Sequence, residues 1–331
     1  MKHRSLLFVA LAITVIAAVT TVFAQTAKPV LVALNKAENS LAIIDPSSMK
    51  VTGRVAVGDG PHEVVLSADG KTAFVANYGG TAGPGNSISV IDVAAAKELR
   101  RVDVSPLMRP HGLQMVGGNL YFTSETNRII ARYDPTANKV DWMMGTGQNS
   151  SHMIAVSADQ KKFYTSNIGS DTITAFEFQA VPPSGSRITH IPVGKQPEAI
   201  DLSPDGKEVW AGLNVDGAVD VVDTATNKFK ERVNIGGRPY RVRFTPDGKN
   251  VVCTMIATKE IIVLDAATRK VVRKLAIESV PMGIVFSTDG KTAFVTINGP
   301  DAVIKIDLEK MEVKGRVDSG KGPDGIAVYG V

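Results

Sequence analysis

Several chemically informative residue types are scarce in this 331-residue sequence. It has one cysteine, Cys253, so an internal disulfide is excluded, and the C-x-x-C-H motif that attaches a covalent c-type haem is absent. Only five histidines occur, and aromatic residues make up 6% of the chain. Lysine and arginine are scattered rather than gathered in blocks, so there is no electrostatic footprint for nucleic acid. These shortages predict a protein held together by packing, with no nucleic-acid partner.

The start of the chain has the pattern of an export signal. A basic start at residues 2–4 precedes an apolar run over residues 6–18, and Val22 and Ala24 are small residues at the positions that a signal peptidase reads. We interpret residues 1–24 as a cleaved signal peptide, because the apolar run is short for a membrane-spanning helix. The expected location is the periplasm or the cell exterior, with no membrane contact after cleavage.

A unit of roughly 40 residues repeats along the rest of the chain. Its most visible element is a turn of the S-x-D-G type, and a proline stands a few residues upstream of it. The turns begin at Ser67, Ser157, Ser203, Thr245 and Ser287. The upstream positions are Pro61, Pro110, Ser151, Pro197, Pro239, Pro281 and Pro323, with serine in place of proline in the third unit. Four short apolar strands fit each unit, which is the size of a propeller blade.

The ends of the chain indicate how the ring closes. After Pro323 only one strand remains, whereas residues 29–35, 40–45 and 50–58 match the second, third and fourth strands of a unit. Pairing of these segments would remove the exposed edges of a linear array. We therefore predict an all-β fold over residues 25–331: a single seven-bladed β-propeller of four-stranded blades, closed by the C-terminal inner strand.

The repeat also resembles a known family. The segments "SPDGKEVWAG", "STDGKTAFVT" and "SISVIDV" are similar to YVTN-type β-propeller repeats, whose relatives include lactonase-like, virginiamycin lyase-like and cytochrome d1-like propellers. The resemblance covers essentially the whole mature chain and implies the propeller fold. It does not select one activity, because a single fold hosts many functions.

The residue after each upstream position begins an inner strand, so these residues are expected to form a ring at one rim of the central channel. In chain order they are His62, His111, His152, Glu198, Tyr240, Met282 and Asp324. Three of the five histidines therefore occupy one register on consecutive blades, followed by a glutamate.

Three imidazoles and a carboxylate suit a transition metal. We predict His62, His111, His152 and Glu198 as metal ligands for zinc, copper, iron or manganese. Without a metal, the same side chains could act as general acid and base. The third reading is structural, since duplication of blades can copy a histidine without any role.

Other residues near the rim complete the prediction. Tyr240, Arg241 and Asp324 are candidate ligand-binding residues, and the insertion at residues 78–86 is expected to overhang the rim at His62. The predicted function is an exported, monomeric propeller that binds a metal ion, a small molecule or a protein partner at the histidine-rich rim. The alternative is a lactonase-like hydrolase or lyase that uses the same histidine and glutamate cluster.

Overall fold

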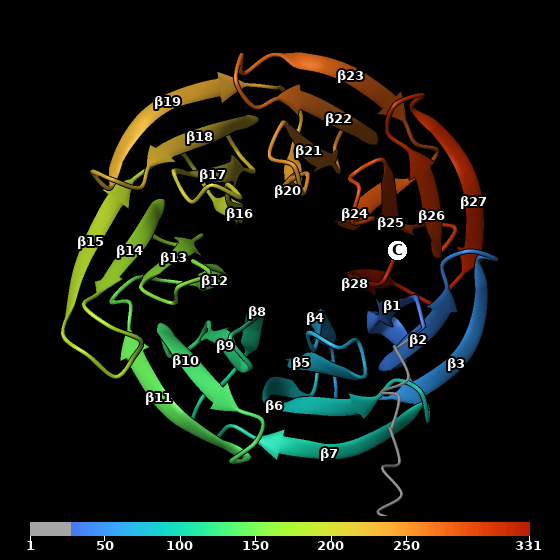
Figure 1. Ribbon diagram of the computed structural model, residues 1–331, viewed down its shortest axis with the longest axis horizontal. Helices are drawn as coiled ribbons and strands as arrows, with labels where there is room; N and C mark the ends of the chain where they lie inside the picture. Colours follow the sequence, from blue (N-terminus) through green and yellow to red (C-terminus); the bar gives the residue numbers. More distant parts are fainter. Residues whose placement is uncertain (1–27) are drawn as a thin grey trace, which may run out of the picture.

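Residues 28–331, the part of the chain that the computed structural model describes, form a ring of seven four-stranded antiparallel sheets around a central channel (Figure 1). Each sheet is one blade, with its first strand beside the channel and its last strand at the outside. The predicted seven-bladed propeller is thereby confirmed. The proposed signal peptide lies outside the described residues. Within residues 28–331, no helix combines the length and apolar character needed to cross a membrane.

The first three blades follow the order of the chain. The first contains β4 (Pro61–Leu66), β5 (Thr72–Gly80), β6 (Gly83–Asp92) and β7 (Lys97–Asp103). The second contains β8 (Pro110–Val116), β9 (Asn119–Ser124), β10 (Ile129–Asp134) and β11 (Lys139–Gly145). The third contains β12 (Ser151–Val156), β13 (Lys162–Asn167), β14 (Thr172–Phe178) and β15 (Ser186–Pro192).

The next three blades repeat the same arrangement. The fourth contains β16 (Pro197–Leu202), β17 (Glu208–Leu213), β18 (Ala218–Asp223) and β19 (Lys228–Asn234). The fifth contains β20 (Pro239–Phe244), β21 (Asn250–Met255), β22 (Glu260–Asp265) and β23 (Val271–Ala276). The sixth contains β24 (Val280–Phe286), β25 (Thr292–Asn298), β26 (Ala302–Asp307) and β27 (Glu312–Asp318).

The seventh blade joins the two ends of the described chain, as predicted. It contains β28 (Pro323–Tyr329), β1 (Val30–Asn35), β2 (Ser40–Asp45) and β3 (Lys50–Ala56), with a short 3-10 turn at Lys36–Glu38 between β1 and β2. The inner strand β28 pairs antiparallel with β1, so that Val30 faces Tyr329 and Val32 faces Ala327. This pairing closes the ring (Figure 1).

The burial pattern of each strand follows from its place in a blade. The middle strands are covered on both faces by neighbouring blades, so β1 and β17 are almost continuously apolar and buried. The outermost strand β7 alternates between exposed and half-buried residues, as a strand with one solvated face does. Large side chains such as Trp210 and Phe294 fill the space between blades and are fully buried.

Hydroxyl groups on four second strands join adjacent blades near the channel. Thr123 accepts a hydrogen bond from the backbone N–H of Gly112 (2.9 Å) and donates one to the carbonyl of His152 on the next blade (2.6 Å). The same bridge recurs at Ser166, Thr254 and Thr296. At the other three junctions the equivalent positions are Ala76, Gly212 and Leu34, which have no hydroxyl.

The insertion at residues 78–86 forms a hairpin. Strands β5 and β6 continue through it, with Gly79 opposite Pro84 and Gly80 opposite Gly83. Gly79 has a φ of +93°, a value that residues other than glycine rarely adopt. The hairpin places Tyr78 over the rim, as described below.

Candidate metal-binding site at the rim of the channel

Each inner strand carries a bulge at its rim residue. The pairing of β4 with β5 shifts between Pro61 and Glu63, and the six other inner strands shift at the equivalent point. A bulge re-aims the side chain of the extra residue. In this propeller it turns His62 toward the rings of the neighbouring blades.

The three rim histidines lie in a row, with His111 in the middle. Its ring centroid is 4.1 Å from that of His62 and 3.7 Å from that of His152, whereas His62 and His152 are 6.4 Å apart. The structure therefore brings together all three histidines that the sequence placed at the rim.

His111 has the character of a metal ligand. Its side chain is fully buried, and within residues 28–331 neither ring nitrogen has a hydrogen-bond partner. Burial and the positive charge on neighbouring His152 hold the pKa of His111 well below its ordinary value, so the ring is neutral. A neutral imidazole has a lone pair on one ring nitrogen and can therefore coordinate a metal ion.

Two further ligand atoms lie close to His111. One ligand atom each from His62, Glu63 and His111 lie within 4.8 Å of one another. The donors around a tetrahedral zinc ion with bonds of about 2.0–2.1 Å are separated by roughly 3.3 Å, so a small inward movement would complete the site. Nδ1 of His62 also lies 3.3 Å from Oδ2 of Asp324, a carboxylate that can orient the ring.

His152 and Glu198 bind each other instead. Nδ1 of His152 is 3.1 Å from Oε1 of Glu125, and its Nε2 is 3.0 Å from Oε1 of Glu198. Burial alone would lower the pKa of His152, but the two carboxylates raise it to about 9. The pKa of Glu198, which burial alone would raise, is lowered to about 2 by His152. In this arrangement both ring nitrogens of His152 face carboxylates of the protein.

The predicted ligand-binding residues are part of the polar network around the histidines. The hydroxyl of Tyr240 donates to Oδ1 of Asp324 at 2.9 Å, and both side chains are buried. Arg241 forms an ion pair with Glu63 and lies over the Tyr240 ring at 4.3 Å. Their hydrogen-bonding groups are thus engaged within the protein.

Two residues of the site, Glu63 and Glu125, were not predicted from the sequence as functional, and Tyr78 was predicted only as part of the insertion at residues 78–86. Glu125 follows β9 and reaches the site from a turn. Tyr78 donates a hydrogen bond to Glu125, and its ring lies edge-on to His62 (5.6 Å between centroids) and His111 (5.3 Å). Tyr78 therefore covers the histidines from the inserted hairpin.

Charged groups of both signs surround the histidines. The carboxylates belong to Glu63, Glu125, Glu198 and Asp324, and Arg241 and His152 pair with three of them in the interior. At the rim, Nζ of Lys36 lies 3.8 Å from Oδ2 of Asp324. The carboxylates of the cluster are thus paired with cations of the protein.

His152 makes a testable contribution to stability. Because its pKa is raised from 6.5 to about 9 in the folded protein, this contribution is complete below about pH 6.5 and is lost as the pH rises through about 9. We expect the melting temperature of the parent to fall over that range, and the fall to be smaller in His152→Gln. The exposed His190 supplies the control, His190→Gln, which should keep the pH profile of the parent. Parallel profiles for His152→Gln and the parent would contradict the assignment.

The fold and the rim define the class of protein: a seven-bladed propeller with a buried histidine and carboxylate cluster at one end of its channel. The chain belongs to the YNCE-like beta-propeller family, whose profile matches residues 5–184 and 180–331. No curated protein matches the sequence.

Two solved structures have a similar fold. Hydrazine synthase from Kuenenia stuttgartiensis superposes with a TM-score of 0.67 at 19% identity, over 87% of this chain and 92% of that one. A functionally unknown protein from Desulfotomaculum acetoxidans gives a TM-score of 0.74 at 11% identity, over 90% and 98% of the two chains. At these identities the likeness concerns the fold, and function must be argued from the site.

Proposed function

We propose that this protein binds a divalent transition-metal ion at the rim of its channel, with His62, Glu63 and His111 as ligands. The observation that carries the proposal is that His111, a buried neutral imidazole whose ring nitrogens have no partner within residues 28–331, lies with His62 and Glu63 so that one ligand atom of each is within 4.8 Å of the others. Imidazole and carboxylate ligands suit zinc, copper, iron and manganese. Asp324, whose Oδ2 lies 3.3 Å from Nδ1 of His62, would help to orient that ring.

A second candidate function rests on His152. It is a protonated imidazole held between two carboxylates, with its ring next to that of His111, and such a group can donate a proton. A bound metal ion would polarise a carbonyl group and make a bound water more acidic. His152 would then protonate the leaving oxygen of an opened lactone, which is the lactonase-like hydrolase or lyase activity.

The metal content of the untagged mature protein tests the first proposal. Mass spectrometry should find about one metal ion per chain, retained after dialysis. Loss of an orienting neighbour of a ligand commonly lowers metal affinity about 10–100-fold, and His111→Ala removes a ligand itself, so its affinity should fall by at least as much. Calorimetric titration with zinc and with manganese measures this change.

The matched control is His190→Ala, because His190 lies exposed on the outer strand β15. It should bind metal as the parent does. A parent protein that contains no metal and cannot be reconstituted would overturn the proposal, as would equal losses in the two variants. A screen of lactone hydrolysis with the metal-loaded protein and His152→Gln tests the second function.

We also propose that the protein is exported, on the basis of the charge and hydropathy pattern of residues 1–24. N-terminal sequencing of the chain recovered from the periplasm or medium should begin at Gln25. Recovery of the full-length chain from the cytoplasm would contradict this.

A further inference from the structure

A cavity lies in the channel beyond the rim histidines. It has a volume of about 450 Å³, is lined by the inner strands, and extends from Glu63 and Arg241 to the first turns of the blades at Ala68 and Pro246. None of the rim histidines lines it. Its volume is within the range of about 300–1,000 Å³ that is usual for small-molecule sites.

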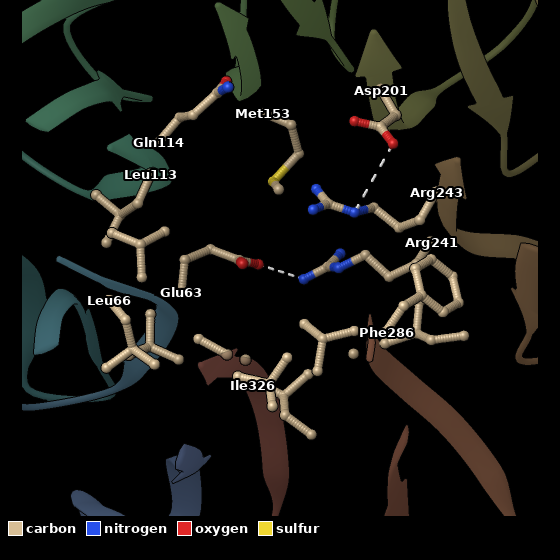
Figure 2. A pocket seen from close by; sticks show the side chains of 18 of the residues that line it. Glu63, Leu66, Leu113, Gln114, Met153, Asp201, Arg241, Arg243, Phe286 and Ile326 are labelled. Atoms are coloured by element: carbon tan, nitrogen blue, oxygen red, sulfur yellow. Dashed lines mark hydrogen bonds and ion pairs between the residues drawn. The ribbon is translucent and has the colours of Figure 1, made fainter. Parts of the chain in front are cut away.

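The ion pair between Glu63 and Arg241 lies at the end of the cavity nearest the rim. These side chains come from the first and fifth blades and meet across the channel (Figure 2). Both are largely buried, with exposed side-chain fractions of 12% and 6%. The charge of Arg241 is therefore already compensated.

Arg243 differs from Arg241 in being only loosely paired, and its side chain is 45% exposed. It lies two residues further along β20, on the same face of the strand, and points into the cavity (Figure 2). Its Nε is 3.9 Å from Oδ2 of Asp201, and within residues 28–331 its guanidinium donates no hydrogen bond. That same Oδ2 accepts the backbone N–H of Phe244 at 2.8 Å.

Apolar side chains also line the cavity, beside its charged and polar groups. Leu66, Leu113, Met153, Phe286 and Ile326 surround the two arginines from five other blades (Figure 2). These side chains can pack against the hydrocarbon body of a ligand.

We propose that this cavity binds a small organic monocarboxylate, whose carboxylate pairs with Arg243 and whose apolar body lies against the wall of the channel. A guanidinium presents five N–H donors in a fork that matches a carboxylate. A monocarboxylate adds one negative charge beside the Arg243–Asp201 pair, whereas a dianion such as phosphate would add two and be repelled more strongly by Asp201. The proposal goes beyond the metal site and does not depend on it.

Hexanoate is a suitable probe, with hexanamide as its uncharged analogue. Calorimetric titration of the metal-free mature protein should show saturable binding of one hexanoate per chain. A hydrogen bond to a charged group contributes about 1.5–3 kcal/mol, so hexanamide and the Arg243→Gln variant should each lower the affinity by about tenfold or more. Arg243→Lys keeps the positive charge but lacks the paired N–H donors of the guanidinium, so it should bind hexanoate with intermediate affinity.

Two further variants make the test specific. Lys249→Gln removes a charge from an exposed turn outside this cavity and should leave hexanoate binding unchanged. His111→Ala should also bind hexanoate like the parent, which separates this proposal from the metal site. Circular dichroism checks that the Arg243 variants fold. The proposal is overturned if hexanoate gives no saturable binding at millimolar concentration, or if Arg243→Gln or hexanamide binds as tightly as the reference.

Discussion

A chain that ends at Pro323 should aggregate or melt at least about 10 °C below the full-length protein. The deleted residues form most of β28, the inner strand of the seventh blade, and include the buried side chains of Ile326 and Ala327. Without them β1 becomes an open edge strand facing the channel, and such an edge promotes aggregation. Lost apolar burial and lost pairing together should cost roughly 5 kcal/mol or more. Thermal melting followed by circular dichroism measures the effect.

A circular permutant is the matched control for this deletion. It would begin with residues 323–331, continue through a short S-x-D-G turn into residue 29, and end at Gly322. Because Tyr329 pairs with Val30, this connection gives the seventh blade the hairpin that most other blades already have. The permutant should melt close to the parent. A deletion variant with an unchanged melting curve would show that ring closure contributes little.

Replacing Arg241 by methionine should destabilise the protein by about 3–5 kcal/mol, because it leaves the buried carboxylate of Glu63 without its counter-charge. Burial alone would raise the pKa of Glu63, and the Arg241 guanidinium is the main influence that holds it below its ordinary value. Chemical denaturation of Arg241→Met and of the parent measures the loss. Arg316→Met is the control, since Arg316 pairs with Asp318 at the exposed surface and should change stability by less than about 1 kcal/mol.

The double variant Glu63→Gln with Arg241→Met identifies the cause of the loss. Removing both charges should recover much of the stability, because no unpaired buried charge remains. If the double variant is as unstable as the sum of the single variants, Arg241 acts through packing and not through its charge. Metal offers a second readout: an ion bound to Glu63 should stabilise Arg241→Met more than it stabilises the parent.

The fold was predictable because each blade repeats its own local signals. The S-x-D-G turns recur in five units, and the proline or Ser151 before each inner strand marks its start. Ring closure followed from a simple count, since one inner strand at the C-terminus matched three strands at the N-terminus. The continuation of strands β5 and β6 through residues 78–86 could not be predicted, because the glycines there obscure the strand pattern.

The site was only partly predictable because its key contacts depend on geometry across the ring. Glu63 directly follows His62, and in a regular strand the two side chains would face opposite sides. The bulge in β4 changes the direction of these side chains. The residue types of β4 give no sign that the strand contains a bulge. The pairing of Glu63 with Arg241, 178 residues later, depends on the width of the channel. Glu125 lies outside the register that located the histidines.

The hydroxyl bridges between blades are distributed unevenly around the rim, and this affects how a metal site could tighten. Thr123 fixes the backbone of His111's blade to that of His152, and Ser166 does the same from His152's blade to Glu198. Between the first two blades the corresponding residue is Ala76, so no such hydroxyl bridge ties His62 and Glu63 to His111. On binding of a metal ion, His62 and Glu63 would therefore move more readily toward the ion than His111 would.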